Sequence, residues 1–544
     1  MFSILCTLPL SLLLAQSTPQ EGVTLFSPMF STESHLLDEQ QNVVHSWQDT
    51  ATPGLSAVLL PNGNLLRSYA LPGPGSSRIG GVGGGIHELD WNSQVLWDFQ
   101  LASPTEQLHH DFQVLPNGNI LLLVWEDKSS LGAISQGRDP ASLAPGAFWT
   151  EKVLELNPET GAIVWEWHLW DHLVQDFDSG MANFGVVADH PQRMNINFQQ
   201  VPLLDGDWAH MNTIDYHPEF DQVLLSVRNC SEFWVIDHST TTLEATTESG
   251  GNYNMGGGLL YRWGNPQAYG RGTAADQMLF EQHDAHWIPD GLPGAGNVLV
   301  FNNGTNRPSG HWSSADELIP PVDAAGNYTL GAGQPYGPNV LIWTYDGQPA
   351  NPFFAPRLSG AQRQPNGNTL ITNGPAGNVM EVDTAGTVIW DWTNPLPSFA
   401  SNGLFKVDRY QHSLWSGDVS LTASASDFVE FHMVVGAAHA DEDYLLLANK
   451  TGVGVGMPLP GGLHLPLNQD GFLRQTFRNS NSPSLSEFSG KLDSTGSATA
   501  TFRTFGPIPS STIGTTLHFA FVLGNPLTGV ASFVSNPVAV EIVP

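Results

Sequence analysis

Phe280-Glu-Gln-His283-Asp-Ala-His-Trp-Ile-Pro289-Asp-Gly291 is the stretch that decides how the chain is organised, because its pattern recurs elsewhere. His283 lies six residues before the turn proline Pro289. The same count leads from Pro116 back to His110 in His110-Asp-Phe-Gln-Val-Leu-Pro116-Asn-Gly-Asn. An aspartate follows the histidine in both copies.

Two more segments carry a polar side chain at the matching position. Ser359 lies six residues before Pro365, and His210 lies eight residues before Pro218, as expected for a strand that is two residues longer. Four repeats therefore place one polar side chain each in a common register. This pattern predicts a closed repeat architecture in which His110, His210, His283 and Ser359 point toward a shared centre.

A second repeated element is an apolar strand that ends in tryptophan. Its six copies end at Val43–Trp47, Val95–Trp97, Ile163–Trp167, Leu259–Trp263, Leu341–Trp343 and Val388–Trp392. Between them lie six copies of the first element, which begin near residues 55, 110, 210, 283, 359 and 401. The turn residues Asn and Gly accept positive φ, and tryptophan suits packing between neighbouring sheets.

The order of these elements predicts how the ring closes. The chain begins with a Trp-ending hairpin and the repeats end with a lone first strand, so residues 43–47 should share a sheet with residues 404–407. Closure of this kind leaves no sheet edge open. We therefore predict an all-β protein with a six-bladed β-propeller over residues 22–412. The long insert at 167–207 is expected to form a partly helical cap.

The pattern changes after Tyr410, where Ser, Thr and Ala alternate with apolar residues. Residues 413–544 are therefore expected to form a C-terminal β-sandwich, in which no chemical constellation stands out.

Composition supports a globular β protein and argues against some partners. The 544 residues are 41% hydrophobic and include 56 Gly and 39 Pro without a short period. The net charge of −33 would repel phosphate backbones and anionic membranes, so nucleic acid is not expected as a partner.

Residues 1–17 have the features of a secretory signal peptide, with a short apolar run before Ala15-Gln-Ser17. The expected location is secreted or periplasmic, without membrane insertion. Removal of this segment removes Cys6 and leaves Cys230 alone, so no internal disulfide is expected.

Several residues near the register positions are expected to be structural. Asp111 and Asp284 follow the key histidines, so strand alternation turns them to the opposite side, where they would fix turns or neighbouring blades. His109 is likewise expected to point away from His110. The remaining candidates that we expect to be structural are His168, His172, His217, His286, Tyr216 and Trp287.

Three stretches carry a resemblance to a known family. They are Asp207-Trp-Ala-His-Met-Asn-Thr-Ile-Asp-Tyr216 with Leu-Leu-Ser-Val-Arg228-Asn-Cys-Ser-Glu-Phe-Trp-Val-Ile-Asp237, then Trp165-Glu-Trp-His-Leu-Trp-Asp171-His172, and Gln282-His283-Asp284. They resemble the bacterial aryl-sulfate sulfotransferases, the PAPS-independent arylsulfotransferase family. The resemblance runs from about Val23 to Tyr410.

The resemblance implies a ping-pong transfer of a sulfuryl group from an aryl sulfate donor to a phenolic acceptor. His283 matches the family's nucleophile, which carries the sulfuryl group on nitrogen, and His110 and His210 match its supporting histidines. Arg228 matches the family's arginine and is expected to be catalytic like these histidines, while Asn212 and Ser359 match substrate-binding positions. No cofactor is implied. Better-known members carry their extra domain at the other end, so acceptor range and assembly are not carried over.

The residue types suit this chemistry in their own right. Sulfuryl transfer resembles phosphoryl transfer in needing an in-line nucleophile and neutralisation of the equatorial oxygens. A neutral imidazole is nucleophilic near pH 7 without a separate base. The planar fork of Arg228 could hold two oxygens, and a protonated histidine could give a proton to the departing phenolate. Which histidine does so is left open.

Two other functions stay open at this point. Converging histidines could bind iron, copper or zinc, although the fixed cation of Arg228 argues against a metal ion. The protein could also be a secreted propeller that only binds a ligand. The natural donor and acceptor, competing hydrolysis by water and the oligomeric state, a homo-oligomer included, are not decided by the sequence.

Overall fold

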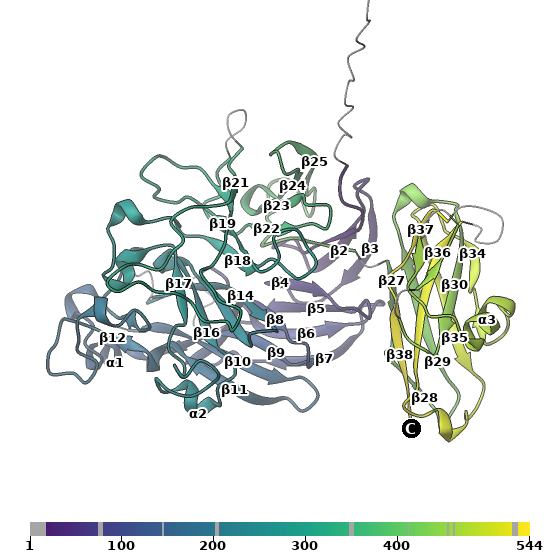
Figure 1. The fold of residues 1–544 in the computed structure, drawn as a ribbon, viewed down its shortest axis with the longest axis horizontal. Coiled ribbons are helices and arrows are strands. Elements are labelled where there is room, and N and C mark those ends of the chain that lie inside the picture. Colours follow the sequence, from purple (N-terminus) through teal and green to yellow (C-terminus); the bar gives the residue numbers. More distant parts are fainter. Residues whose placement is uncertain are drawn as a thin grey trace, which may run out of the picture.

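The structure is a computed structural model that describes residues 18–73, 80–143, 146–201, 206–347, 353–411, 413–453, 456–460, 463–524 and 531–544. The expected signal peptide, residues 1–17, lies outside the described residues. Nearly all regular structure is β-strand (Figure 1). Among the helices of the described ranges, none is long and apolar enough to cross a membrane.

Six four-stranded antiparallel sheets make up the larger part of the molecule. Five of them use consecutive strands: β4 to β7 (Pro53–Leu59, Leu65–Ala70, Gly84–Leu89, Val95–Gln100), β8 to β11 (Glu106–Val114, Ile120–Asp127, Trp149–Asn157, Ala162–His168), β14 to β17 (Met211–His217, Gln222–Val227, Glu232–Asp237, Tyr261–Trp263), β18 to β21 (His283–Trp287, Val298–Asn302, Ser314–Leu318, Trp343–Tyr345) and β22 to β25 (Gly360–Arg363, Thr369–Asn373, Asn378–Val382, Val388–Thr393).

The sixth sheet joins the two ends of this part of the chain. Its order is β26 (Asp408–Tyr410), β1 (Val23–Phe26), β2 (Glu33–Leu37) and β3 (Val43–Gln48). Residues 43–47 therefore share a sheet with the last strand of the repeats, as predicted, except that the strand expected over 404–407 forms a few residues later, at β26. No edge is left open at the junction of the two ends, because β26 and β1 pair from Val23 with Tyr410 to Leu25 with Asp408.

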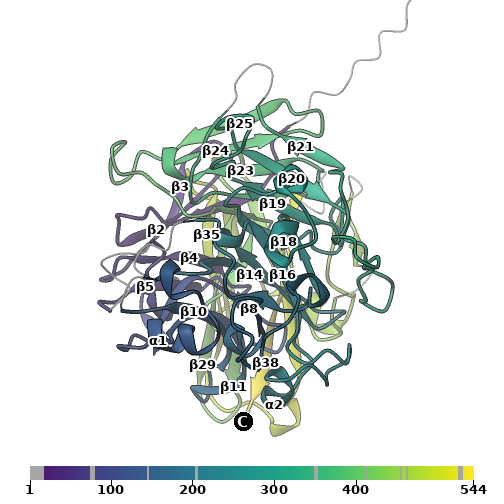
Figure 2. The ribbon, with the colours of Figure 1, turned by 90° about the vertical axis from the view of Figure 1, so that its left-hand side faces the viewer.

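The first strands of the sheets surround the centre. Neighbouring first strands contact one another in the order β4, β8, β14, β18 and β22. Next to the sheet that contains β26, the amide of Ser359 donates a hydrogen bond to Phe405 O at 2.7 Å. Figure 2 shows β4, β8, β14 and β18 toward the middle of this propeller-like arrangement and β3, β11, β21 and β25 toward its rim.

Tryptophans fix the outer strands against their neighbours, as the sequence predicted. Every fourth strand contains one of these tryptophans, although β21 begins at Trp343 instead of ending there. Some of the indole N–H groups reach carbonyls beyond their own sheet. Trp47 Nε1 donates to Asp90 O at 3.0 Å, and Trp390 Nε1 donates to Glu39 O at 2.8 Å. These two indoles combine apolar burial with a directional bond.

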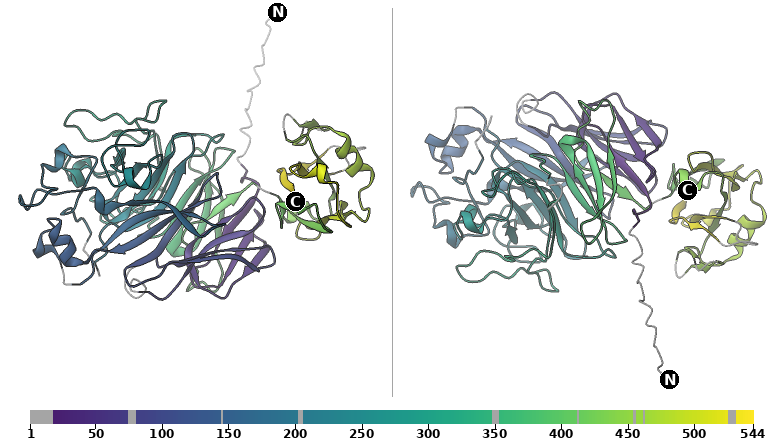
Figure 3. Two further views of the ribbon diagram at one scale, coloured as in Figure 1. Left: turned by 90° about the horizontal axis from the view of Figure 1, so that it is seen from below. Right: turned by 90° about the horizontal axis from the view of Figure 1, so that it is seen from above.

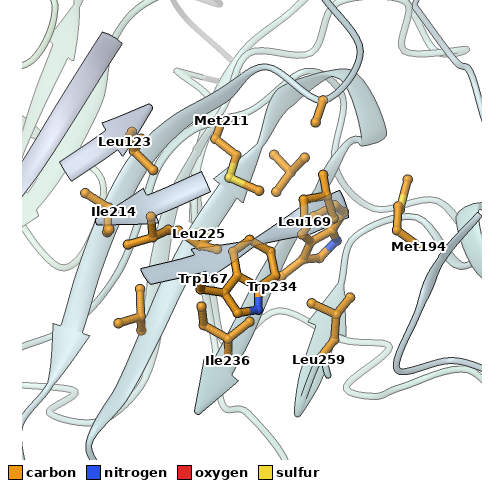
Figure 4. Close-up of a cluster of buried hydrophobic side chains, with 14 of the residues drawn as sticks. Leu123, Trp167, Leu169, Met194, Met211, Ile214, Leu225, Trp234, Ile236 and Leu259 are labelled. Carbon is orange, nitrogen blue, oxygen red and sulfur yellow. The ribbon is translucent and has the colours of Figure 1, made fainter. Parts of the chain in front are cut away.

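The insert after β11 is less helical than expected. Its described residues form the one-turn 3-10 helices η2 (Leu169–Asp171) and η3 (Val187–Asp189) and the short parallel strands β12 (Leu173–Val174) and β13 (Met194–Asn195). Leu169 and Met194 belong to the same buried cluster as Trp234 of β16 (Figure 4). The insert is therefore held by apolar burial rather than by helix formation.

Residues after β26 form two further sheets. One has the order β27 (Leu414–Ser416), β29 (Asp427–Val434), β35 (Ser497–Thr504) and β33 (Leu485–Ser486). The other has the order β28 (Ser420–Thr422), β38 (Val538–Val543), β36 (Thr516–Leu523), β30 (Asp443–Asn449) and β34 (Ser489–Lys491), with β37 (Phe533–Val534) on β36. Side chains of both sheets, among them Phe431 and Phe519, share one core.

These two sheets lie beside the six sheets (Figures 1 and 3). An aromatic contact joins the two parts. Trp415 is fully buried, with its ring centroid 5.3 Å from that of Trp91, and Trp91 also stacks on His432 at 4.8 Å. The remaining elements are short: α1 (Ser129–Ser135), α2 (Thr242–Ala245), α3 (Gly471–Arg478), β31 (Met457–Pro458), β32 (His464–Leu465), η1 (Pro140–Ser142), η4 (Arg228–Cys230), η5 (Pro266–Tyr269), η6 (Ala274–Asp276), η7 (Gly374–Ala376), η8 (Ala437–His439) and η9 (Ser510–Thr512).

Candidate active site

The backbone is irregular at or near the four predicted site positions, His110, His210, His283 and Ser359, which lie on or just before the innermost strand of their sheets. Pairing is interrupted between Leu108 and Phe112 in β8, and similar shifts occur in β4, β14 and β18. His110 and His210 have φ values of 48° and 55°, and Ser359 has 85°. Such conformations cost a non-glycine residue on the order of 1–3 kcal/mol and concentrate at functional sites. The bulge in β8 breaks the two-residue alternation at His110, whereas β22, which follows Ser359, pairs without a register shift.

Three histidines and one arginine meet there. The rings of His110 and His210 are 4.6 Å apart between centroids. Arg228 begins η4 directly after β15, and its amide donates to His210 O at 3.2 Å. Burial, then the Arg228 charge, lowers the pKa of His283 to about 3. Burial, then His210 and other neighbours that include His283 and Arg228, lowers the pKa of His110 well below its ordinary value. The structure thus brings His110, His210, His283 and Arg228 into one electrostatic environment.

Hydrogen bonds define the protonation of His283. The amide nitrogen of Asn303 donates to Ala355 O at 2.8 Å and to Leu358 O at 3.0 Å, so its oxygen faces the imidazole. That oxygen lies 2.8 Å from His283 Nδ1, which therefore carries the proton. The Leu358 amide donates to Nε2 at 3.3 Å. His283 is thus a neutral imidazole whose Nε2 lone pair accepts from the Leu358 N–H, a bond that is given up when Nε2 attacks.

His210 has an acidic partner that the sequence analysis did not single out. Its Nδ1 contacts Asp207 Oδ2, and Asp207 O accepts a hydrogen bond from the Asn229 side chain at 3.2 Å. The only signal in the sequence was the short spacing within Asp207-Trp-Ala-His210. The contact with Asp207 fixes the orientation of the His210 ring, so Nε2 is the ring nitrogen left for a substrate oxygen.

Arg228 is paired with a second residue that the sequence analysis missed. Its guanidinium contacts Glu281 Oε2, and it also donates to Asn229 Oδ1 at 2.9 Å. The other oxygen of Glu281 accepts from Asn306 Nδ2 at 2.9 Å. Glu281 therefore orients the guanidinium and competes with an anionic substrate for it.

Asn212 and Ser359 are placed differently from the charged residues. Asn212 is fully buried and donates to Gln282 O at 2.8 Å, so it fixes the backbone beside His283. The hydroxyl of Ser359 accepts from the Gly374 amide at 3.0 Å. In this arrangement both side chains support the site through backbone contacts.

An apolar cluster completes the centre on its other side. Leu55, Leu358 and Phe405 are buried together, with Met29 packed against them. The Phe405 ring centroid lies 6.2 Å from that of His110. Leu55 stands at the same count before Pro61 as His110 does before Pro116, so a usable signal was present in the sequence. The site therefore has a polar half, from β8, β14 and β18, and an apolar half.

The aspartates that follow the histidines connect the sheets, as expected. Lys406 Nζ lies 2.8 Å from Asp111 Oδ2 and 3.6 Å from Asp284 Oδ1. Burial lowers the pKa of Lys406, but these carboxylates outweigh burial and raise the pKa above its ordinary value. Asp284 also accepts from the Ala361 amide at 3.0 Å, so three sheets are linked around one buried ammonium.

The prediction that His109 points away from His110 is wrong. Their Nδ1 atoms are 2.9 Å apart, because the bulge in β8 breaks the two-residue alternation on which the prediction rested. Within the described ranges of the chain, no group of three or more His, Cys, Asp or Glu residues is arranged to hold a metal ion.

Comparison with known proteins gives one family. The model of the Arylsulfotransferase (ASST) family matches residues 61–393. No curated protein matches the sequence. Among solved structures, a protein of unknown function from Bacteroides caccae is 12% identical, with 71% of this chain and 98% of that chain covered and a TM-score of 0.39. Virginiamycin B lyase from Staphylococcus aureus is 8% identical, with 69% and 82% covered and a TM-score of 0.33. Similarity this low carries no argument about fold or activity.

Proposed function

This chain belongs to the arylsulfotransferase (ASST) family, since the matched segment spans more than half of its length, and from this premise we propose a ping-pong mechanism through a sulfohistidine at His283. Family membership supports aryl sulfotransferase activity on small-molecule substrates. The observation that carries the proposal is the state of His283, which is neutral and has its proton on Nδ1.

In the proposed first half-reaction, the Nε2 lone pair attacks the sulfur of an aryl sulfate. The N–S bond forms, the S–O bond to the aryl group breaks, and the phenolate leaves with a proton. Nδ1 keeps its proton, which Asn303 accepts as a hydrogen bond while the imidazole becomes positively charged. The Leu358 N–H, which faces Nε2 in the free enzyme, is then released to donate to a sulfuryl oxygen.

The surrounding groups suit the other demands of the reaction. Arg228 would exchange Glu281 for two sulfuryl oxygens, and His210, held in place by Asp207, would contact the third. The apolar side chains Leu55, Leu358 and Phe405 would contact the aryl ring. In the second half-reaction a phenol loses its proton, its oxygen attacks the sulfur, and the N–S bond breaks.

The proposal extends to architecture and location. The six sheets, one of which combines strands from both ends of this part of the chain, support a six-bladed β-propeller over residues 22–412. The two later sheets, which share one core, support a β-sandwich over 413–544. We propose that residues 1–17 direct secretion or export to the periplasm.

Trapping the intermediate tests the proposal. With 4-nitrophenyl sulfate and no acceptor, the protein should gain one acid-labile sulfuryl group, and mass spectrometry should place it on His283. His283→Asn should lose both half-reactions, whereas His210→Asn or Arg228→Lys should slow adduct formation by about 10²- to 10³-fold. An adduct that persists in His283→Asn would move the nucleophile to another histidine. No adduct, with rates that depend on donor and acceptor together, would contradict the ping-pong mechanism. Resistance to a chelator separates this activity from metal catalysis.

A further inference from the structure

A buried carboxylate and two histidines form a continuous line that ends at the candidate site. Glu151 of β10 has Oε2 2.7 Å from His109 Nε2, and His109 Nδ1 is 2.9 Å from His110 Nδ1. The side chains of Glu151 and His109 are completely buried. His109 also stacks on Trp125, with 4.2 Å between the ring centroids, so its ring is fixed in place.

The polar atoms along this line have few other hydrogen-bond partners. Glu151 Oε1 accepts from the Met211 amide at 3.0 Å, which leaves Oε2 for His109. Oε2 lies 2.7 Å from His109 Nε2 but outside hydrogen-bond geometry, and neither atom has a hydrogen-bond partner among the described residues. His109 occupies Nδ1 of His110, so Nε2 is the nitrogen of His110 that is left for a substrate.

The environment favours one neutral arrangement at rest. Burial, then the Asp207 carboxylate, raises the pKa of Glu151 well above its ordinary value. Burial, then His210, lowers the pKa of His109. Glu126 and Arg228 are the other charged groups that act on the line. The proton therefore resides on Glu151, and both histidines are neutral.

This arrangement determines the tautomer of His110. A proton on Glu151 Oε2 would face His109 Nε2 across the 2.7 Å contact, which would place the proton of His109 on Nδ1. His109 Nδ1–H then donates to His110 Nδ1, and the proton of His110 is on Nε2. An ionised Glu151 reverses both donors and leaves His110 Nε2 without a proton. The buried pair thus decides whether His110 is a proton donor or a proton acceptor toward the site.

We propose that Glu151 and His109 are a proton relay that acts through His110 Nε2, supplying the proton for the departing phenolate and recovering it from the phenolic acceptor. The relay rests on the proposed sulfotransferase function. His110 is the group that touches the substrate, while His109 and Glu151 act through it.

The proton movements balance. As the S–O bond breaks, the Nε2 proton of His110 passes to the phenolate oxygen. The Nδ1 proton of His109 moves to His110 Nδ1, and the Glu151 proton moves to His109 Nε2. Both histidines stay neutral, and Glu151 becomes a carboxylate. Attack by the acceptor phenol runs the same steps in reverse and restores the resting state.

Donors that differ in leaving group test the relay. A nitrophenolate is a stable anion and needs little protonation in the transition state, whereas the phenolate of phenyl sulfate needs more. General acid assistance contributes typically about 10²- to 10⁴-fold. Glu151→Gln keeps the shape but cannot pass on a proton. We expect its rate of His283 adduct formation to fall by about 10²-fold or more with phenyl sulfate and by about tenfold or less with 4-nitrophenyl sulfate.

Glu155→Gln is the matched control. Glu155 lies on the same strand as Glu151, and its Oε2 lies 3.1 Å from Nε2 of a histidine, His238, that is not part of the site. The control variant should leave the ratio of the two donor rates unchanged. Equal losses with both donors in Glu151→Gln, or no loss, would overturn the relay. If that variant does not fold, His109→Phe, which keeps the stack on Trp125, is measured with the same two donors and judged by the same ratio. Absence of any adduct in the wild-type protein would instead refute the proposed function.

Discussion

Asn303 decides which nitrogen of His283 carries the proton, and Asn303→Leu removes that control with little change of side-chain volume. In the wild-type protein Asn303 accepts from His283 Nδ1 and donates to Ala355 O and Leu358 O. Leucine offers none of these bonds. The imidazole can then turn its lone pair away from the donor sulfate, and adduct formation should slow.

The size of the effect follows from the bonds that are lost. A net hydrogen bond is worth about 1 kcal/mol, so losing the acceptor at Nδ1 should lower the rate of adduct formation at least about fivefold. An upper bound is about 10⁴-fold, the effect of a wrong histidine tautomer in a serine protease triad. Two buried carbonyls also lose a donor, at about 1–3 kcal/mol each, although Ser313 Oγ stays 3.4 Å from Ala355 O.

The assay is the burst of nitrophenol release from 4-nitrophenyl sulfate, measured below the temperature at which either variant unfolds. Asn449→Leu is the control, because Asn449 is buried in the C-terminal part and bridges Gly452 O and Asn468 O, both at 2.8 Å. It should lose comparable local stability and keep the wild-type burst rate. A wild-type burst rate in folded Asn303→Leu, or an equal loss in both variants, would refute the tautomer argument.

Three further results are expected. Glu281→Gln should lower the KM for the aryl sulfate severalfold, because Arg228 is no longer shared with a carboxylate; a higher KM would mean that Glu281 serves mainly to orient the guanidinium. Gly81→Ala should lower the rate of adduct formation, since its Cβ would lie 1.8 Å from His110 Cε1, whereas Gly118→Ala, at a similar φ in open space, should not; equal rates would contradict this contact. Burial lowers the pKa of His432 to about 4, so the unfolded chain takes up a proton below pH 6.5 that the folded chain does not, and stability is lost as pH falls from 6.5 toward 4. His432→Phe should therefore reduce the drop in Tm between pH 7 and pH 5, by removing about 2 kcal/mol of acid destabilisation, and an unchanged drop would rule this out.

The sheets could be predicted because their signals are local. Turn residues at fixed counts and Trp-ending apolar strands each define one hairpin, and every fourth strand contains one of the six tryptophans, although β21 begins at Trp343. The offset between the two chain ends was enough to predict that residues 43–47 share a sheet with the last repeat strand, which forms at β26. The insert after β11 was expected to be a partly helical cap, and its helices are single turns, with Leu169 of η2 packed in the cluster of Trp234.

The register positions of His110, His210 and His283 could be read from the sequence alone, because His110 and His283 lie six residues before a turn proline and His210 lies eight residues before one, on a longer strand. Their partners were decided only by the tertiary structure. Three carboxylates contact site residues or their neighbours. Glu151 contacts His109, Asp207 contacts His210, and Glu281 contacts Arg228. A bulge shifts the alternation of side chains without a glycine or proline to reveal it, which is why His109 was assigned to the wrong side. Protonation depends further on burial and on charges brought together from distant segments, and a linear pattern contains neither.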